Sequence, residues 1–237
     1  MKLSEELRQV ADPIFEAIFK HPFVQGIACG DVKREALIHY VKQDFSYLNA
    51  FIKVYGIAIS KCDNRKDMQI FNDQISFILN SEIHPHRNFC KVAGVRYETL
   101  QHEPLVPTAS HYIDHMLTVA SSGSLAEILA ALLPCPWTYW EIGKKLIAER
   151  HPDQNHPFYD WITFYGKNNG KKPLTEILYN RLDELTTNGS INEKERIKDH
   201  FIKSCQLEYA FWDMAYHLEE WPVKVSIKTN IGVSNAL

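Results

Sequence analysis

The sequence has few glycines, little net charge and no long hydrophobic run, and each shortage excludes a class of protein. Twenty-six basic against 29 acidic residues leave a net charge of −3, which argues against a nucleic-acid partner held by phosphate neutralisation. The longest nearly uncharged apolar stretch, 128–140, contains two prolines and is too short for the about 20 residues that a membrane span needs. We therefore expect no nucleic-acid partner and no membrane partner.

Cysteine pairs and cofactor-binding motifs are lacking as well. The five cysteines are scattered and include no CxxC pair, so neither a disulfide framework nor a zinc cluster is expected. The N-terminus carries Glu5 and Glu6 where a signal peptide would have its apolar run, which predicts a cytoplasmic protein. No GxGxxG, P-loop or GxSxG motif occurs, so dinucleotide, phosphate-loop and α/β-hydrolase functions lose their main support.

Helical periodicity runs through almost the whole chain. Together with only ten glycines in 237 residues, against a usual share of about 7%, it predicts an all-α protein: a single multi-helix bundle over residues 1–222 and a C-terminal tail over 223–237. We expect Ser4 and Asp63 to start helices, Ser124 and Glu127 to form a capping box, and Gly143 to lie inside a helix. The expected helices are 4–20, 23–29, 33–61, 63–92, 108–120, 124–150, 157–165, 174–187 and 192–220.

Two carboxylates fall on stripes that the periodicity reserves for the core. Asp44 shares a face with Tyr40 and Tyr47, and Glu208 shares one with Phe201 and neighbouring apolar residues. A lone buried carboxylate is unfavourable unless it is paired or hydrogen-bonded. Either residue alone is more often a rim residue or a partner for a Tyr or Arg, but two internal carboxylates favour a shared central pocket.

A thiol occupies a third apolar stripe, at an interrupted point of its helix. In Pro134-Cys135-Pro136, Pro136 has no N–H and disfavours helical geometry for the residue before it. We expect the helix to kink or to restart with Pro136 as its first residue. Cys135 would then lie at a positive helix N-terminus, which favours the nucleophilic thiolate, although a lone cysteine on a core stripe is usually only a small hydrophobe.

Metal binding is the competing explanation for the polar residues. Glu82 with His86 and Asp213 with His217 have the i, i+4 spacing that helical di-iron sites use. His217 lies next to the charged end of its helix, where a solvated histidine is expected. We therefore favour an aromatic pocket that suits a flat, basic heterocycle, and assign no metal.

Several segments, read in order, resemble the thiaminase II (TenA) family, which has the heme-oxygenase-like all-α fold. The most specific is LLPC at 132–135 with the aromatic half-helix that follows, and the sequence departs from the family pattern at Pro136 and in its C-terminal extension. The matching segments span about residues 20–215 and are HPFVQG at 21–26, YVKQD at 40–44, the Glu82 to His86 pair, LAALLPCPW at 129–137, Trp161 to Gly166 and EYAFW at 208–212.

The resemblance implies cysteine-dependent hydrolysis at the methylene carbon attached to a 4-aminopyrimidine, in thiamine salvage. The substrate would be 4-amino-5-aminomethyl-2-methylpyrimidine or thiamine, with no cofactor, and the protein would be a homotetramer. By analogy Cys135 is the nucleophile, Glu208 the general acid/base and Asp44 the binder of the aminopyrimidine edge. The remaining predicted substrate-binding residues donate hydrogen bonds or form walls for the ring: Tyr47, Tyr112, Tyr139, Tyr165 and Phe211.

Two other functions stay open from the sequence. One is a di-iron oxidase on the same fold, and the other is a regulatory protein that binds a pyrimidine without converting it. The sequence also does not separate thiamine from the aminopyrimidine as the preferred substrate, because both carry the same ring and differ only in the leaving group.

Overall fold

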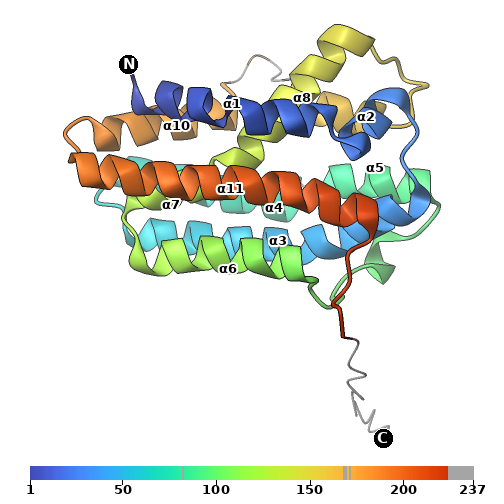
Figure 1. Cartoon of the computed structure of the whole chain (residues 1–237), viewed down its shortest axis with the longest axis horizontal. Coiled ribbons are helices and arrows are strands. Elements are labelled where there is room, and N and C mark those ends of the chain that lie inside the picture. The colour runs from blue at the N-terminus through green and yellow to red at the C-terminus, as the bar shows by residue number, and fades with distance from the viewer. Residues whose placement is uncertain (82, 168–169, 171, 224–237) are drawn as a thin grey trace, which may run out of the picture.

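The computed structural model describes residues 1–81, 83–167, 170 and 172–223, and every regular element in these ranges is a helix (Figure 1). The predicted all-α class is confirmed. None of the described helices is both long and apolar enough to span a membrane. The elements are α1 Leu3–Lys20, α2 Pro22–Cys29, α3 Arg34–Ser60, α4 Arg65–Asn80, α5 Ile83–Ala93, the short 3-10 helix η1 Tyr97–Thr99, α6 Pro107–Ser122, α7 Leu125–Leu132, α8 Pro134–Arg150, α9 Tyr159–Gly166, α10 Leu174–Thr186 and α11 Ile191–His217.

Two 27-residue helices, α3 and α11, pack against each other in the centre of the bundle. In Figure 1, α11 crosses the front of the molecule between α1 and the α3–α6 pair. The surrounding helices turn their apolar stripes toward this pair, so Tyr40, Phe51 and Phe201 are buried. Asp44 and Glu208 lie on the same stripes and are buried too, which confirms their predicted internal position.

Ser4 and Asp63 lie within two residues of the observed helix starts, but neither of them caps its helix. Ser4 lies inside α1 rather than before it; its N–H and hydroxyl donate to Asp183 at 2.8 and 2.7 Å, tying α1 to α10. Asn64, not Asp63, caps α4, because its side chain accepts the N–H of Asp67 at 3.0 Å. The remaining boundaries agree within about three residues, and the predicted tail lies outside the described residues except for Val223.

The single helix predicted over 63–92 is in fact two helices, α4 and α5, which part near Ser81. Pro85, in the first turn of α5, explains the break. It has no N–H to give to the carbonyl of Ser81, four residues earlier, and its ring would clash with that carbonyl. The apolar period continues across the interruption, so periodicity alone did not reveal it.

The helix predicted over 124–150 is interrupted, but its second half, α8, begins at Pro134 rather than at Pro136. Pro134 occupies the first helical position, where the missing N–H is tolerated. The carbonyl of Ala131, at the end of α7, accepts the hydroxyl of Ser204 from α11 at 2.8 Å. The break leaves Cys135 as the second residue of α8, in its first turn.

Two further local predictions for this region are confirmed. Ser124 and Glu127 form the capping box of α7, with the N–H of Glu127 donating to Ser124 Oγ and the N–H of Ser124 donating to Glu127 Oε2. Gly143 lies inside α8, where this helix crosses α9. A Cβ on Gly143 would be 2.5 Å from the backbone N of Gly166 and 2.7 Å from its Cα. This approach holds Tyr165, the neighbour of Gly166, against α8.

We expect Gly143→Ala to lower the free energy of unfolding by about 1–3 kcal/mol, because the new methyl group would meet backbone atoms that cannot move aside. Gly56→Ala is the matched control. Gly56 lies inside α3 with nothing within 4 Å of an added Cβ, so the same substitution should stabilise by about 0.4–1 kcal/mol. Urea unfolding of the two variants measures the difference, and equal effects at both positions would contradict the close crossing.

Candidate active site

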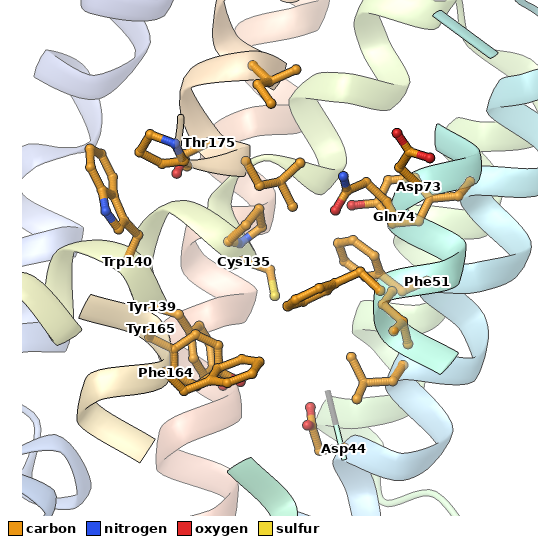
Figure 2. Close-up of a pocket in the computed structure, with 18 of the residues that line it drawn as sticks. Asp44, Phe51, Asp73, Gln74, Cys135, Tyr139, Trp140, Phe164, Tyr165 and Thr175 are labelled. Atoms are coloured by element: carbon orange, nitrogen blue, oxygen red, sulfur yellow. The ribbon is translucent and has the colours of Figure 1, made fainter. Parts of the chain in front are cut away.

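A cavity of about 540 Å³ opens between α3, α4, α8, α9 and α10. Aromatic and aliphatic side chains form most of its surface, with a few polar groups between them (Figure 2). Its size lies within the usual range of about 300–1,000 Å³ for small-molecule sites. The lining residues that the sequence predicted are Asp44, Tyr47, Cys135, Tyr139 and Tyr165.

Cys135 presents its sulfur to this cavity (Figure 2). The residue is half-buried and is in no disulfide. Because it lies in the first turn of α8, the partial positive charge of that helix end favours an anionic sulfur. The position meets the structural requirement for a nucleophile that attacks a ligand inside the cavity.

Tyrosine rings form two sides of the cavity. Tyr139 and Tyr165 pack with ring centroids 4.9 Å apart, and the hydroxyl of Tyr139 is hydrogen-bonded to that of Tyr40. Tyr47 lies on α3; its buried hydroxyl has that of Tyr112 as a neighbour but makes no well-formed hydrogen bond to the described residues. A buried hydroxyl without a partner is unfavourable, so Tyr47 has a donor available for a ligand.

Asp44 is the buried one of two carboxylates at the cavity surface; the other, Asp73 of α4, is exposed. Oδ2 of Asp44 lies 2.5 Å from Nε2 of His86, a buried residue of α5. Nδ1 of His86 lies 3.4 Å from the hydroxyl of Tyr97. The sequence did not predict this pairing; it suggested His86 only as the i+4 partner of Glu82. The sequence did contain one indication of this pairing: a carboxylate on an apolar stripe, such as Asp44, needs a buried hydrogen-bond donor.

Glu208, Tyr112 and Phe211 lie behind the cavity surface, and none of them is among the described residues that line it. The Tyr112 hydroxyl donates to Glu208 Oε2 at 3.0 Å. The rings of Phe211 and Tyr112 both pack against the ring of Tyr47, with centroid distances of 5.4 Å and 4.9 Å respectively. In the structure these three residues are therefore separated from the cavity by the side chains that line it.

Burial controls the protonation of this region. It raises the pKa of the Glu208 carboxyl to about 8, with a further increase from Asp44, while the Tyr112 hydrogen bond acts in the opposite direction. Glu208 is therefore mainly neutral at pH 7 and carries a proton that it can donate. Burial also raises the pKa of four tyrosine hydroxyls, which stay protonated donors: Tyr40, Tyr47, Tyr112 and Tyr139.

The residues that were considered for a di-iron site make other contacts wherever the structure describes them. His86 pairs with Asp44, whereas Asp213 lies 3.4 Å from His21 and 3.2 Å from the exposed His217. Glu82 lies outside the described residues. Within the described ranges, no three His, Cys, Asp or Glu residues form a group that could hold a metal ion.

The fold and the cavity define a class: a helical-bundle protein with a cysteine facing an internal aromatic small-molecule site. A solved structure from Shewanella denitrificans OS217, described as a domain with a heme oxygenase-like fold, superposes with a TM-score of 0.62 at 12% identity, covering 90% of this chain and 92% of that one. The predicted heme-oxygenase-like fold is confirmed. The chain belongs to the TENA/THI-4/PQQC family, whose model matches residues 8–218.

Similar proteins support this assignment along almost the full length. The chain is 39% identical over 224 residues to the aminopyrimidine aminohydrolase of Bacillus subtilis strain 168, which covers 93% of this chain and 92% of that protein. It is 36% identical over 222 residues to the aminopyrimidine aminohydrolase of Halalkalibacterium halodurans, and the match covers 93% of this chain and 98% of that protein. The solved structure of a TenA family transcription regulator from Silicibacter sp. TM1040 superposes with a TM-score of 0.80 at 28% identity. The match covers 91% of this chain and 96% of that one.

The raised pKa of Glu208 predicts a pH-dependent stability. Between an unfolded pKa near the ordinary 4.5 and a folded pKa of about 8, the folded state holds a proton that the unfolded state has released. This group therefore stabilises most below the unfolded pKa, and its contribution falls by about 1.4 kcal/mol per pH unit as the pH rises. Urea unfolding at pH 5, 6, 7 and 8 should show a shallower decline for Glu208→Gln. Parallel pH dependences would mean that Glu208 is ionised in the folded protein.

Proposed function

We propose that the protein is an aminopyrimidine aminohydrolase, a thiaminase II that acts in thiamine salvage. It would hydrolyse 4-amino-5-aminomethyl-2-methylpyrimidine, and thiamine, to 4-amino-5-hydroxymethyl-2-methylpyrimidine. The observation that carries the proposal is the Cys135 sulfur facing an aromatic cavity that also contains the Asp44 carboxylate. The names and the length-wide similarity of the curated relatives support it.

The cavity surface supplies the binding contacts. The aminopyrimidine ring lies between the Tyr139–Tyr165 side and Tyr47, where flat aromatic faces suit a heterocycle. Asp44 accepts a hydrogen bond from the 4-amino group. Phe211 and Tyr112 act from behind, by fixing the ring of Tyr47.

The reaction divides into two steps through a covalent adduct. The Cys135 thiolate forms a bond to a ring carbon while a ring nitrogen takes up a proton, and the ring electrons then break the bond between the methylene carbon and the amine. The amine leaves protonated. Water next adds to the exocyclic methylene and loses a proton. The ring nitrogen then gives up the proton it had taken, the sulfur–carbon bond breaks with its electrons going to the thiolate, and the aromatic ring is restored. The net change is the addition of water and the release of ammonia, or of the thiazole from thiamine.

Glu208 is the proposed general acid, because its carboxyl keeps a proton near neutral pH. The group lies behind the cavity surface and contacts Tyr112. Proton delivery therefore requires either a shift of the covering rings or a water molecule between Glu208 and the substrate. After the amine has left, the same group in its ionised form can accept the proton of the attacking water.

The proposed assembly is a homotetramer and the proposed compartment is the cytoplasm. Residues 1–222 would form one catalytic domain. No cofactor is assigned, because cysteine addition and proton transfer account for the hydrolysis.

A regulatory protein that only binds a pyrimidine is the second candidate, since one neighbour of similar structure is described as a transcription regulator. The two candidates differ in one observable. A hydrolase releases the hydroxymethylpyrimidine from the aminomethyl compound, whereas a binding module retains the ligand unchanged.

Cys135→Ser should lower turnover by at least about a thousandfold, because a serine hydroxyl is a far weaker nucleophile than a thiolate. Binding of the product pyrimidine should change less than about threefold, since its ring contacts come from other side chains. Cys29→Ser, at an exposed cysteine of α2, is the matched control and should keep normal rates. Near-normal turnover by Cys135→Ser would exclude the covalent mechanism.

A further inference from the structure

His86 is a buried titratable group that the proposed reaction does not use. It lies on α5, has a relative exposure of 2% and faces the cavity carboxylate rather than the cavity itself. Its two ring nitrogens face different partners: Nε2 faces Oδ2 of Asp44 at 2.5 Å, and Nδ1 faces the Tyr97 hydroxyl at 3.4 Å. Contacts at both ring nitrogens therefore fix the orientation of the imidazole ring.

The geometry assigns the direction of the short contact. A carboxylate oxygen can only accept, so the proton lies on Nε2 and is donated to Oδ2. Because Oδ2 is engaged in this way and Asp44 lies at the cavity surface, we assign Oδ1 to the contact with a ligand in the cavity. Tyr97 adds to the constraint, since its ring packs against the imidazole at 5.4 Å between centroids.

We propose that His86 is a positioning residue that makes Asp44 a fixed, acceptor-only contact and thereby selects 4-aminopyrimidines over 4-oxopyrimidines. An exocyclic amino group donates to Oδ1, whereas an exocyclic carbonyl at the same position would place two acceptors against each other. This discrimination depends on the carboxylate staying in place. Without the His86 donor, the Asp44 side chain can turn away from the carbonyl.

The inference rests on the proposed function, because it concerns how the same cavity recognises its substrate. It extends that proposal by naming the group that sets the choice between amino and oxo substituents. His86 would act through Asp44 and touch no substrate, as outer-shell partners of ligating side chains do in metal sites.

Calorimetric titration with two ligands tests the inference: 4-amino-5-hydroxymethyl-2-methylpyrimidine and its 4-oxo counterpart. The wild-type protein should prefer the amino compound. In His86→Leu the affinity for the amino compound should fall about tenfold, as expected for a lost hydrogen bond to a charged group, while the affinity for the oxo compound stays the same or rises. The amino-to-oxo ratio is the decisive readout, because a merely structural defect would weaken both ligands alike.

Three further variants separate positioning from folding. His86→Gln keeps a donor near Oδ2 and should restore most of the ratio. Tyr97→Phe keeps the contact between His86 and Asp44 but removes a contact that fixes the imidazole ring. The amino-to-oxo affinity ratio should therefore narrow by about threefold, a smaller change than in His86→Leu, which loses the whole donor. His84→Leu, at an exposed histidine of the same helix, should change nothing.

Two outcomes would contradict the inference: an unchanged ratio in His86→Leu, or an equal loss for both ligands. If His86→Leu does not fold, the amino-to-oxo ratios in the other two variants decide. An unchanged ratio in Tyr97→Phe would overturn the inference, and so would loss of the ratio in His86→Gln. Failure of the proposed function is a different result, in which the wild-type protein neither binds the aminopyrimidine nor converts the aminomethyl compound.

Discussion

Two carboxyl groups buried between the central helices constrain much of the surrounding structure. Each needs a hydrogen-bond donor, because an unpaired buried carboxyl is strongly unfavourable. Asp44 has His86 from α5, and Glu208 has Tyr112 from α6. The positions of α5 and α6 are thus tied to α3 and α11 by polar contacts as well as by apolar packing. The two environments also separate the proposed roles, since one carboxyl accepts from the ligand and the other, with its raised pKa, holds a proton.

The proposed nucleophile, Cys135, depends on a second constraint, the interruption between α7 and α8. A continuous helix would bury position 135 within a regular stripe, whereas the proline-initiated α8 places Cys135 at a helix N-terminus with its sulfur in the cavity. The crossing at Gly143 and Gly166 then brings α9 close enough for Tyr165 to form the adjoining wall. The break between α7 and α8 and the close approach of α8 to α9 therefore bring Cys135 and Tyr165 to the same cavity.

Periodicity predicted the helical class and most helix boundaries, because an amphipathic stripe records which residues face the core. It did not predict the break before Pro85, across which the stripe continues, or the depth of Glu208 and Phe211. Both were predicted to act on the substrate, but an apolar stripe shows only which way a side chain points and not how far it lies from the cavity. The Asp44–His86 contact was missed for a related reason: the two residues lie on different helices, and only the packing of α5 against α3 brings them together.

In the proposed reaction water, and not dioxygen, supplies the oxygen of the product's hydroxyl group. The most direct measurement is turnover of 4-amino-5-aminomethyl-2-methylpyrimidine in ¹⁸O-labelled water without dioxygen, with the product analysed by mass spectrometry and ammonia quantified in parallel. The proposed hydrolysis predicts one ¹⁸O atom in the hydroxymethyl group of each product molecule and one ammonia released with it. Product that forms only with dioxygen, or ligand that binds and is recovered unchanged, would contradict it.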